Sequence, residues 1–437
     1  MYSIGLDIGT TSISFALLDL KTGVPSRTFS VPSGSDVPFD DPDQPFSCQR
    51  IDVILSKVTE GLRSLVDAHP GEIASIGVTG QMHGIVYLDG ALNPLGDLIT
   101  WRDRRGNLPY RCGKTYSEYL SSVTGHHVPT GYGAVTLFHD FVSGLLPKGT
   151  EVIATIMDFV AAKLSGSGRI LMHPQNAAGI GLFDIASGSF DRAAIIKAGL
   201  DCSLFPEIAS LECTVLGRYE GTVPVTVALG DNQASFIGSV KDPSSYALVN
   251  VGTGSQVSLV TSSLKAAPGI EIRPFVDGKY LAVGSAICGG KALAYLASLI
   301  GDIVDVSGGS RDPYDIINEV MGSSCERSPL TVDTRFFGTR EDPSVRGSIS
   351  SITGENLTLK NLIGGFLDGI SGELHELYTR MPESSSNPVL IGSGSGLRKN
   401  PSLKARIERD FGKKVTLPEY EEEAAVGAAR YAARALV

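Results

Sequence analysis

The sequence predicts an α/β protein made of two duplicated sheet domains with a ligand cleft between them. Its 437 residues are too many for one ordinary core and suffice for two domains of roughly 200 residues each. A turn rich in glycine and hydroxyl residues follows an apolar strand twice, at residues 9–12 and 252–255. Each turn leads into a strand in which apolar residues alternate. This repetition predicts a duplication, with the domain boundary near residue 222.

The composition predicts a soluble globular chain. Hydrophobic residues make up 42% and charged residues 19%, and the net charge of −10 argues against nucleic acid and anionic membranes as partners. The first apolar stretch is broken at Asp7, and no apolar run approaches ~20 residues, so we expect a cytoplasmic protein without signal peptide or membrane span. The six cysteines form no C-x-x-C pair, which predicts reduced structural thiols. The sequence leaves open whether the chain forms a homodimer.

The first half is expected to begin with a β-hairpin. Residues 2–8 and 12–18 have strand patterns, and the tip between them reads Asp-Ile-Gly-Thr-Thr-Ser. Helical apolar spacing over residues 51–66 ends at His69-Pro70-Gly71, and a strand over residues 73–78 follows.

The second half is expected to repeat this order. Strand patterns over residues 246–251 and 256–260 precede a helix that begins after Gly290 and runs to about residue 300. We expect irregular structure over residues 301–342 and a long helix over residues 362–377. A strand at residues 388–391, a glycine turn, a helix to about residue 411 and a last helix from Glu421 complete the chain.

Three glycine-rich turns are candidate phosphate sites. Backbone N–H groups of the turn Gly9-Thr10-Thr11 can cradle phosphate oxygens, and Asp7 at the strand end can hold a hydrated Mg²⁺. The alternative is a tight turn with a surface Asp. The second turn, Gly252-Thr253-Gly254, favours the phosphate interpretation, because two duplicated turns can grip one polyphosphate from both sides. Residues 392–396 form a third turn between a strand and a helix, a context that suits a nucleotide.

Asp231 is the candidate catalytic base. It follows an apolar strand at the cleft end of the second domain, where a carboxylate can accept the proton of an attacking hydroxyl. The alternative is a helix cap.

A polyol pocket is expected from polar residues and the only tryptophan of the chain, which stands beside a charged pair. Such pockets combine an apolar face with a few hydrogen-bonding groups. The candidates are Gln81, Met82, His83, Trp101, Arg102 and Asp103. The alternative for the last three is a partly buried Trp beside a surface ion pair. The histidines lack metal-ligand spacing.

These motifs, in this order, resemble the FGGY carbohydrate kinases, which belong to the superfamily of actin, hexokinase and heat-shock ATPases. The resemblance covers nearly the whole chain. The matching segments are Gly5-Leu6-Asp7-Ile8-Gly9-Thr10-Thr11-Ser12, Gly80-Gln81-Met82-His83-Gly84, Trp101-Arg102-Asp103, Leu229-Gly230-Asp231-Asn232-Gln233, Gly252-Thr253-Gly254, Gly392-Ser393-Gly394 and Glu423-Ala424-Ala425-Val426-Gly427-Ala428-Ala429.

The resemblance implies two ribonuclease H-like domains of the actin and hexokinase type. Residues 1–222 would be the sugar-binding FGGY domain and residues 223–437 the nucleotide-binding FGGY domain. It also implies ATP and Mg²⁺ as cofactors, Asp7 as the metal ligand, Asp231 as catalytic base, and Asp231 and Asn232 beside the sugar. The residues it assigns to ATP are Gly9, Thr10, Thr11, Gly252, Thr253, Gly254, Gly394, Ser395 and Asn400.

Within the family, two segments point to the substrate. Residues 131–134 and 173–178 look most like sedoheptulokinases, whereas residues 81–84 are shared with xylulose kinases. The resemblance therefore implies conversion of D-sedoheptulose to sedoheptulose 7-phosphate, with xylulose or another pentulose as the alternative. A non-catalytic nucleotide-gated sugar sensor is the alternative of a different class. One departure is Ser14, which stands where the family often has a basic residue.

Overall fold

The chain folds into two compact units. The computed structural model describes residues 1–39, 44–210, 213–240, 245–252, 254–339, 342, 344–382, 384 and 389–436. Unit 1 comprises Met1–Lys241, Pro274–Gly278 and Glu422–Val437, and unit 2 comprises Asp242–Arg273 and Lys279–Glu421. Unit 1 thus extends past the expected boundary at residue 222, and it also includes the C-terminal residues of the chain. The reason is that α7 (Asp231–Ser239) packs against the C-terminal helix α13 (Glu423–Ala433).

The sheet of unit 1 combines an antiparallel hairpin region with parallel strands. Its first three strands, β3 (Pro25–Pro32), β2 (Ser12–Asp19) and β1 (Tyr2–Ile8), are antiparallel neighbours. Strand β5 (Ile73–Gly80) then pairs parallel with β1, as do β14 (Val223–Thr226) and the short β15 (Leu229–Gly230) with β5. The edge strand β13 (Val215–Tyr219) pairs antiparallel with β14.

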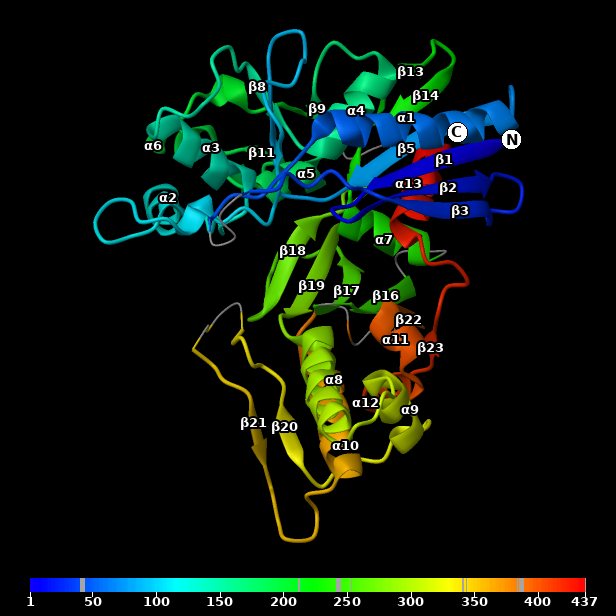
Figure 1. The fold of residues 1–437 in the computed structure, drawn as a ribbon. Helices are drawn as coiled ribbons and strands as arrows, with labels where there is room; N and C mark the ends of the chain where they lie inside the picture. Colours follow the sequence, from blue (N-terminus) through cyan, green and yellow to red (C-terminus); the bar gives the residue numbers. More distant parts are fainter. Residues whose placement is uncertain are drawn as a thin grey trace. The chain divides into compact units, whose positions relative to one another are not determined.

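Helices cover both faces of this sheet (Figure 1). Helix α1 (Ile51–Ala68) packs on the face that carries Phe15, and its Gly61 lies directly against that ring. Helix α13 covers the face that carries Gly5, because successive side chains of a strand point to opposite faces. Helix α4 (Ile156–Ser165) adds Phe159 and Val160 to the same apolar core.

The contact of α13 is made through small residues. A Cβ atom at Gly5 would lie 1.8 Å from the Ala425 carbonyl oxygen, and one at Gly77 would lie 2.0 Å from the Ala428 oxygen. A Cβ atom at Gly427 would lie 1.8 Å from the carbonyl oxygen of Ala234 in α7. Side chains larger than hydrogen would keep these backbones apart. The closing glycine- and alanine-rich segment is therefore a packing motif.

The remainder of unit 1, which lies mostly between β5 and β13 in the chain, has its own apolar cluster. Its helices are α2 (Tyr116–Thr124), α3 (Gly133–Val142), α5 (Pro174–Ile180) and α6 (Arg192–Lys197), with the 3₁₀ turns η1 (Arg105–Asn107) and η2 (Cys202–Leu204). Its small strand pairs are β4 (Cys48–Gln49) with β7 (Leu98–Ile99), β6 (Val86–Leu88) with β8 (Val152–Ala154), β9 (Leu171–Met172) with β12 (Glu207–Ile208), and β10 (Phe183–Asp184) with β11 (Ser189–Phe190).

Unit 2 repeats the strand order of unit 1. Strands β19 (Tyr280–Ala286), β17 (Ser255–Thr261) and β16 (Tyr246–Val251) are antiparallel neighbours. Strand β22 (Val389–Ser393) pairs parallel with β16, and β23 (Val415–Thr416) pairs parallel with β22. The strand β18 (Ile270–Pro274) lies at the edge beyond β19. The same pairing pattern in both units confirms the predicted duplicated α/β fold.

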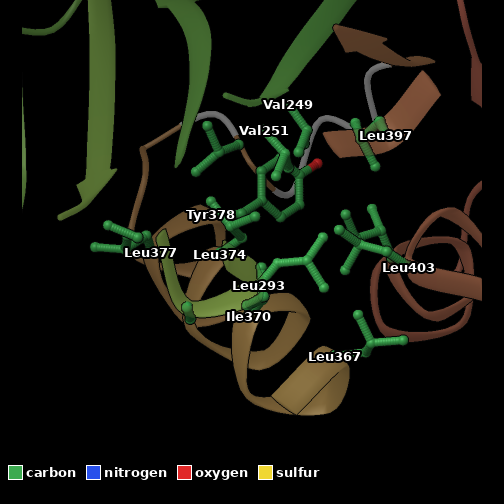
Figure 2. Packing of buried hydrophobic residues seen from close by; sticks show 14 of the residues in the cluster. Val249, Val251, Leu293, Leu367, Ile370, Leu374, Leu377, Tyr378, Leu397 and Leu403 are labelled. Atoms are coloured by element: carbon green, nitrogen blue, oxygen red, sulfur yellow. The ribbon is translucent and has the colours of Figure 1, made fainter. Parts of the chain in front are cut away.

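The core of unit 2 lies between this sheet and its helices. Figure 2 shows Val249 and Val251 of β16 facing Leu374 and Tyr378 of α10 (Leu359–Thr379), with Leu293 of α8 (Gly289–Val306) beside them. The remaining elements are α9 (Pro313–Met321), α11 (Ser395–Lys399), α12 (Pro401–Phe411), the pair β20 (Thr331–Asp333) with β21 (Ser348–Ser350), and, at the chain end in unit 1, the 3₁₀ turn η5 (Arg434–Leu436).

The expectation of irregular structure over residues 301–342 was wrong in part. Helix α8 continues to Val306, and α9 and β20 fall within this stretch. The start of α9 has a sequence signal, because Asp312 caps it by accepting hydrogen bonds from the N–H groups of Tyr314 and Asp315, and Pro313 follows at the first helical position. Among the described residues, no helix is both long and apolar enough to cross a membrane.

Candidate active site

Asp7 lies near the end of β1 in an environment that disfavours its charge. Its Oδ1 atom is buried and has no hydrogen-bond partner within the described part of the chain. Burial, together with the nearby carboxylates of Asp231 and Glu422, raises the pKa of Asp7 to about 7. Ser14 stands directly opposite Asp7 in the β1–β2 register, and its hydroxyl contacts Ser30, so the position offers no basic group. A divalent cation fits this carboxylate, because it would use the unpartnered oxygen and favour the ionised form.

A hydrogen-bond network fixes the hairpin tip that follows Asp7. The Trp101 indole N–H donates to Thr10 Oγ1 over 3.0 Å, and Thr10 Oγ1 donates to Gln81 Oε1 over 3.2 Å. Gln81 Nε2 donates to Gln49 Oε1, and Gln49 Nε2 donates to the Thr10 carbonyl oxygen, each over 2.7 Å. The structure thus brings three predicted site residues together. Trp101 keeps 45% of its surface exposed, so a ring face remains available to a ligand.

Met82 and His83 follow β5 in a strained turn. His83 has a positive φ of 75°, and its Nδ1 lies 2.7 Å from the carbonyl oxygen of Gly179. A carbonyl oxygen only accepts, so Nδ1 carries a hydrogen. The ring stacks on Tyr132 at a centroid distance of 4.2 Å. The Met82 sulfur lies against Gly230, since a Cβ atom there would be 2.7 Å away.

Arg102 and Asp103 have different environments. Arg102 is exposed, with its guanidinium 5.5 Å from the Trp101 ring centroid. Asp103 is only 1% exposed, and both of its oxygens accept hydrogen bonds from Arg105, at 2.8 and 3.1 Å. Arg105 also pairs with the buried Asp140, at 2.6 Å. The ion pair beside Trp101 is therefore buried and structural, and Asp103 is committed to it.

Asp231 is the first residue of α7, directly after β15. The N-cap position belongs to Gly230, and Asp231 Oδ1 accepts a hydrogen bond from the N–H of Asn232 over 2.6 Å. Asn232 Oδ1 and Gln233 Oε1 are buried, with no hydrogen-bond partner in the described ranges. Strand β15 pairs with the end of β5, which leads into Met82 and His83. Unit 1 therefore places Asp231 beside the predicted sugar residues and close enough to Asp7 to raise its pKa.

Sequence reasoning missed the amides on α5. Gln175 and Asn176 are fully buried and bond to the strand that precedes Asp231. They belong to the segment of residues 173–178, which the sequence singled out only by family likeness. The sequence signal that could have identified them is the pair of adjacent amide residues at the start of a short helix.

The predicted nucleotide residues lie in unit 2, at adjacent strand ends. The N–H of Gly252 donates to the Gly254 carbonyl oxygen over 2.9 Å, and Thr253 lies outside the described residues. Gly394 has a φ of 87°, and a Cβ atom there would lie 2.5 Å from the Val251 carbonyl oxygen. The turn after β22 is thus packed on the end of β16, which brings Gly394 close to Gly252.

Ser395 and Asn400 flank the short helix α11. Ser395 is its first residue and is exposed. Asn400 is 3% exposed, and its Oδ1 accepts a hydrogen bond from the Leu403 N–H over 2.8 Å, which makes it the N-cap of α12. The carbonyl of this side chain is therefore used inside the protein, and contact with adenosine stays a prediction.

Unit 2 also has a cavity of about 410 Å³, lined in part by Arg335 and Arg380. Arg335 is paired with Asp333 at 2.6 Å, and Arg380 is paired with Glu376 at 2.5 Å. The pKa of Glu373, another lining residue, is raised to about 7 by burial. Because its arginines are paired within the protein, we assign this cavity no part in phosphoryl transfer.

Comparisons with known proteins give one consistent result. The model of the FGGY family of carbohydrate kinases, N-terminal domain, matches residues 2–238. The sedoheptulokinase of Mus musculus is 28% identical over 468 aligned residues, covering 98% of this chain and 96% of its own. The xylulose kinase of Staphylococcus xylosus is 23% identical and covers 99% and 90%. The crystal structure of xylulose kinase from Rhodospirillum rubrum matches with a TM-score of 0.83 at 20% identity, over 100% of this chain and 90% of that one, and so shows the fold.

Proposed function

Because the chain belongs to the FGGY family of carbohydrate kinases, we propose that it phosphorylates a primary hydroxyl of a ketose with ATP. The preferred substrate in this proposal is D-sedoheptulose, and the product is sedoheptulose 7-phosphate. Kinase activity on a carbohydrate follows from the family, whereas the choice of sugar rests on the similarity to sedoheptulokinase. The observation that carries the catalytic part is the grouping of Asp7, Asp231 and the Met82–His83 pair in unit 1.

In the proposed reaction, the oxygen of the sugar hydroxyl attacks the γ-phosphorus of ATP. The bond from this phosphorus to the β–γ bridging oxygen breaks, and ADP leaves. Asp231, as a carboxylate, accepts the hydroxyl proton. In this proposal His83, whose ring is oriented by the bond from Nδ1 to Gly179, contacts another sugar hydroxyl. The exposed face of Trp101 can pack against the carbon face of the sugar.

The polyphosphate and its metal would be held by the groups that the sequence predicts for them. Asp7 would hold Mg²⁺, which reduces the negative charge of the phosphates when bound. In this proposal the backbone of Gly9, Thr10 and Thr11 contacts phosphate oxygens, as does the turn at residues 252–254. The turn at Gly394, which is packed on the end of β16, would contact the adenosine.

A coupled assay of ADP release tests the substrate. We expect a higher kcat/KM for sedoheptulose than for xylulose or ribulose in a panel that also contains alditols and sugar acids. A clear preference for a pentulose would remove the heptulose and favour the xylulose alternative. ADP release that does not respond to any sugar would contradict kinase activity on this panel.

The variant Asp231→Asn tests the base. Asn keeps the shape and can still accept the hydrogen bond from the Asn232 N–H, so we expect ATP binding to persist while kcat falls at least ~10²-fold. The matched control is Asp312→Asn at the true N-cap of α9, where Asn caps as well as Asp and the rate should not change. A folded Asp231→Asn protein with the parental kcat would exclude Asp231 as the base.

A further inference from the structure

Helix α5 is unusual in burying two consecutive amide side chains. Gln175 and Asn176 are both 0% exposed, and they lie at the start of a seven-residue helix that opens with Pro174. A buried amide is costly unless its polar atoms are hydrogen-bonded. The partners of these two side chains therefore indicate why the amides are there.

Both amides hold the same short strand, β15, and the residue before it. Gln175 Oε1 accepts a hydrogen bond from the Gly230 N–H over 3.2 Å. Asn176 Nδ2 donates to the Ala228 carbonyl oxygen over 3.1 Å. The residue between them, Leu229, is held from the opposite strand, because Thr79 Oγ1 donates to its carbonyl oxygen over 2.9 Å. The backbone is thus fixed at each of the three residues that precede Asp231.

Asn176 is itself anchored from behind. Its Nδ2 also donates to Asp158 Oδ1 over 3.0 Å, and Thr155 Oγ1 donates to Asp158 Oδ2 over 2.6 Å. Thr155 and Asp158 belong to the start of α4, in the apolar core under the sheet. The amide that holds β15 is therefore tied to a rigid element and not to a surface loop.

The other end of α5 holds the proposed sugar-binding turn. The carbonyl oxygen of Gly179 accepts the hydrogen bond from His83 Nδ1 over 2.7 Å. A Cβ atom at Gly179 would lie 3.0 Å from Met82 Cε and 3.4 Å from His83 Nδ1. One short helix therefore bonds both to the strand of Asp231 and to the ring of His83.

We propose that α5 is a spacer that sets the position of the Asp231 carboxylate relative to the sugar, with Gln175 and Asn176 as positioning residues. This inference rests on the proposed function, because it takes Asp231 as the base and His83 as a sugar ligand. Neither amide has to touch the reacting atoms. Their effect is transmitted through the backbone of residues 228–230, and an error of about 1 Å in such a position can cost up to ~10²-fold in rate.

The test compares two substitutions of Gln175 that differ in one property. Gln175→Met keeps the length but removes the acceptor for the Gly230 N–H, whereas Gln175→Glu keeps an acceptor oxygen at the same place. We expect kcat to fall about 10-fold in the Met variant, with the KM for ATP unchanged and a shifted pH profile of kcat. In the Glu variant we expect kcat to return to within about threefold of the parent. Equal kcat and equal pH profiles in parent and Met variant would overturn the proposal.

A second measurement separates this inference from the proposed function. Hydrogen exchange at the Gly230 amide, followed in protein without any substrate, should be faster in Gln175→Met than in the parent and close to parental in Gln175→Glu. An unchanged exchange rate of the Gly230 amide in Gln175→Met would overturn the proposal that α5 is a spacer, and this holds whether or not the protein is a ketose kinase. If Gln175→Met does not fold, Gln175→Asn replaces it, because it keeps an amide but shortens its reach. The same two outcomes then apply.

Discussion

Gly427 in α13 offers a direct test of how the end of the chain is held. We predict that Gly427→Ala destabilises unit 1, although alanine is the better helix former by about 1 kcal/mol. The added Cβ atom would lie 1.8 Å from the Ala234 carbonyl oxygen and 2.6 Å from the Ala234 carbonyl carbon. Both are backbone atoms of α7, so no side chain can rotate away.

The size of the effect follows from these distances. Real Cβ atoms stay at least about 3.0 Å from such an oxygen, so α13 would have to retreat from α7 by about 1.2 Å. The retreat would loosen the close contacts of α13 with β1 at Gly5 and with β5 at Gly77. Overpacking of this kind costs about 1–3 kcal/mol and occasionally more. With the contacts at both strands affected, we expect a net loss of about 3 kcal/mol.

The assay is urea unfolding followed by the fluorescence of the single tryptophan, Trp101, which reports on unit 1. The matched control is Gly372→Ala in α10, where nothing lies within 4 Å of the added Cβ atom. In that variant, unfolding of unit 2 measured by circular dichroism should show a gain of up to about 1 kcal/mol. A Gly427→Ala protein at least as stable as the parent would refute the packing argument. Because α13 touches β1 and α7, we also expect kcat to fall.

Two further predictions concern buried charges. Burial raises the pKa of Asp158 from 3.8 to about 7. Between these pH values the folded protein holds a proton on Asp158 that the unfolded chain does not hold, so the free energy of unfolding falls as the pH rises through this window. The variant Asp158→Asn lacks this titration. Its free energy of unfolding in urea, compared with that of the parent at the same pH, should therefore rise by up to about 4 kcal/mol from pH 4 to pH 7 and stay constant above pH 7. A difference between variant and parent that does not depend on pH would contradict this prediction. Arg105→Met should cost about 3–5 kcal/mol, because it leaves Asp103 and Asp140 buried without their cation. The exposed pair Arg50–Asp52 provides the control, because Arg50→Met should leave thermal unfolding unchanged. Equal effects of Arg105→Met and Arg50→Met on thermal unfolding would contradict the prediction.

The local elements and the duplication could be predicted from the sequence. Side-chain periodicity is a property of neighbouring residues, so β1, α1, β5, β16 and α10 begin within a few residues of their predicted starts. The repeated glycine turns predicted two related sheets, and the strand order confirms them. The stretch from residue 301 to 342 was misread, because the Asp312–Pro313 start signal of α9 is short and lies among loop-like residues.

The candidate site was predictable as a set of residues but not as a set of roles. Asp7, Asp231 and the Met82–His83 pair were predicted because each lies at or just after a strand end, where the ends of neighbouring parallel strands meet. Asp103 was assigned to the sugar through the motif Trp101-Arg102-Asp103, and only the fold shows that Arg105 joins it to Asp140 of α3.

By itself, the sequence determined the kinds of elements and their duplication, and it supplied the candidate residues for the chemistry, because these depend on local spacing and residue type. The tertiary structure alone decided where the last helix packs and which polar groups form hydrogen bonds or ion pairs within the protein. Gly5 and Gly77 accept α13 because neither has a side chain, although the helix comes more than 340 residues later. Gln175 and Asn176 hold the strand before Asp231 across a separation of more than 50 residues. Such pairings depend on which backbones the folded core brings within bonding distance, and no spacing along the chain encodes that distance.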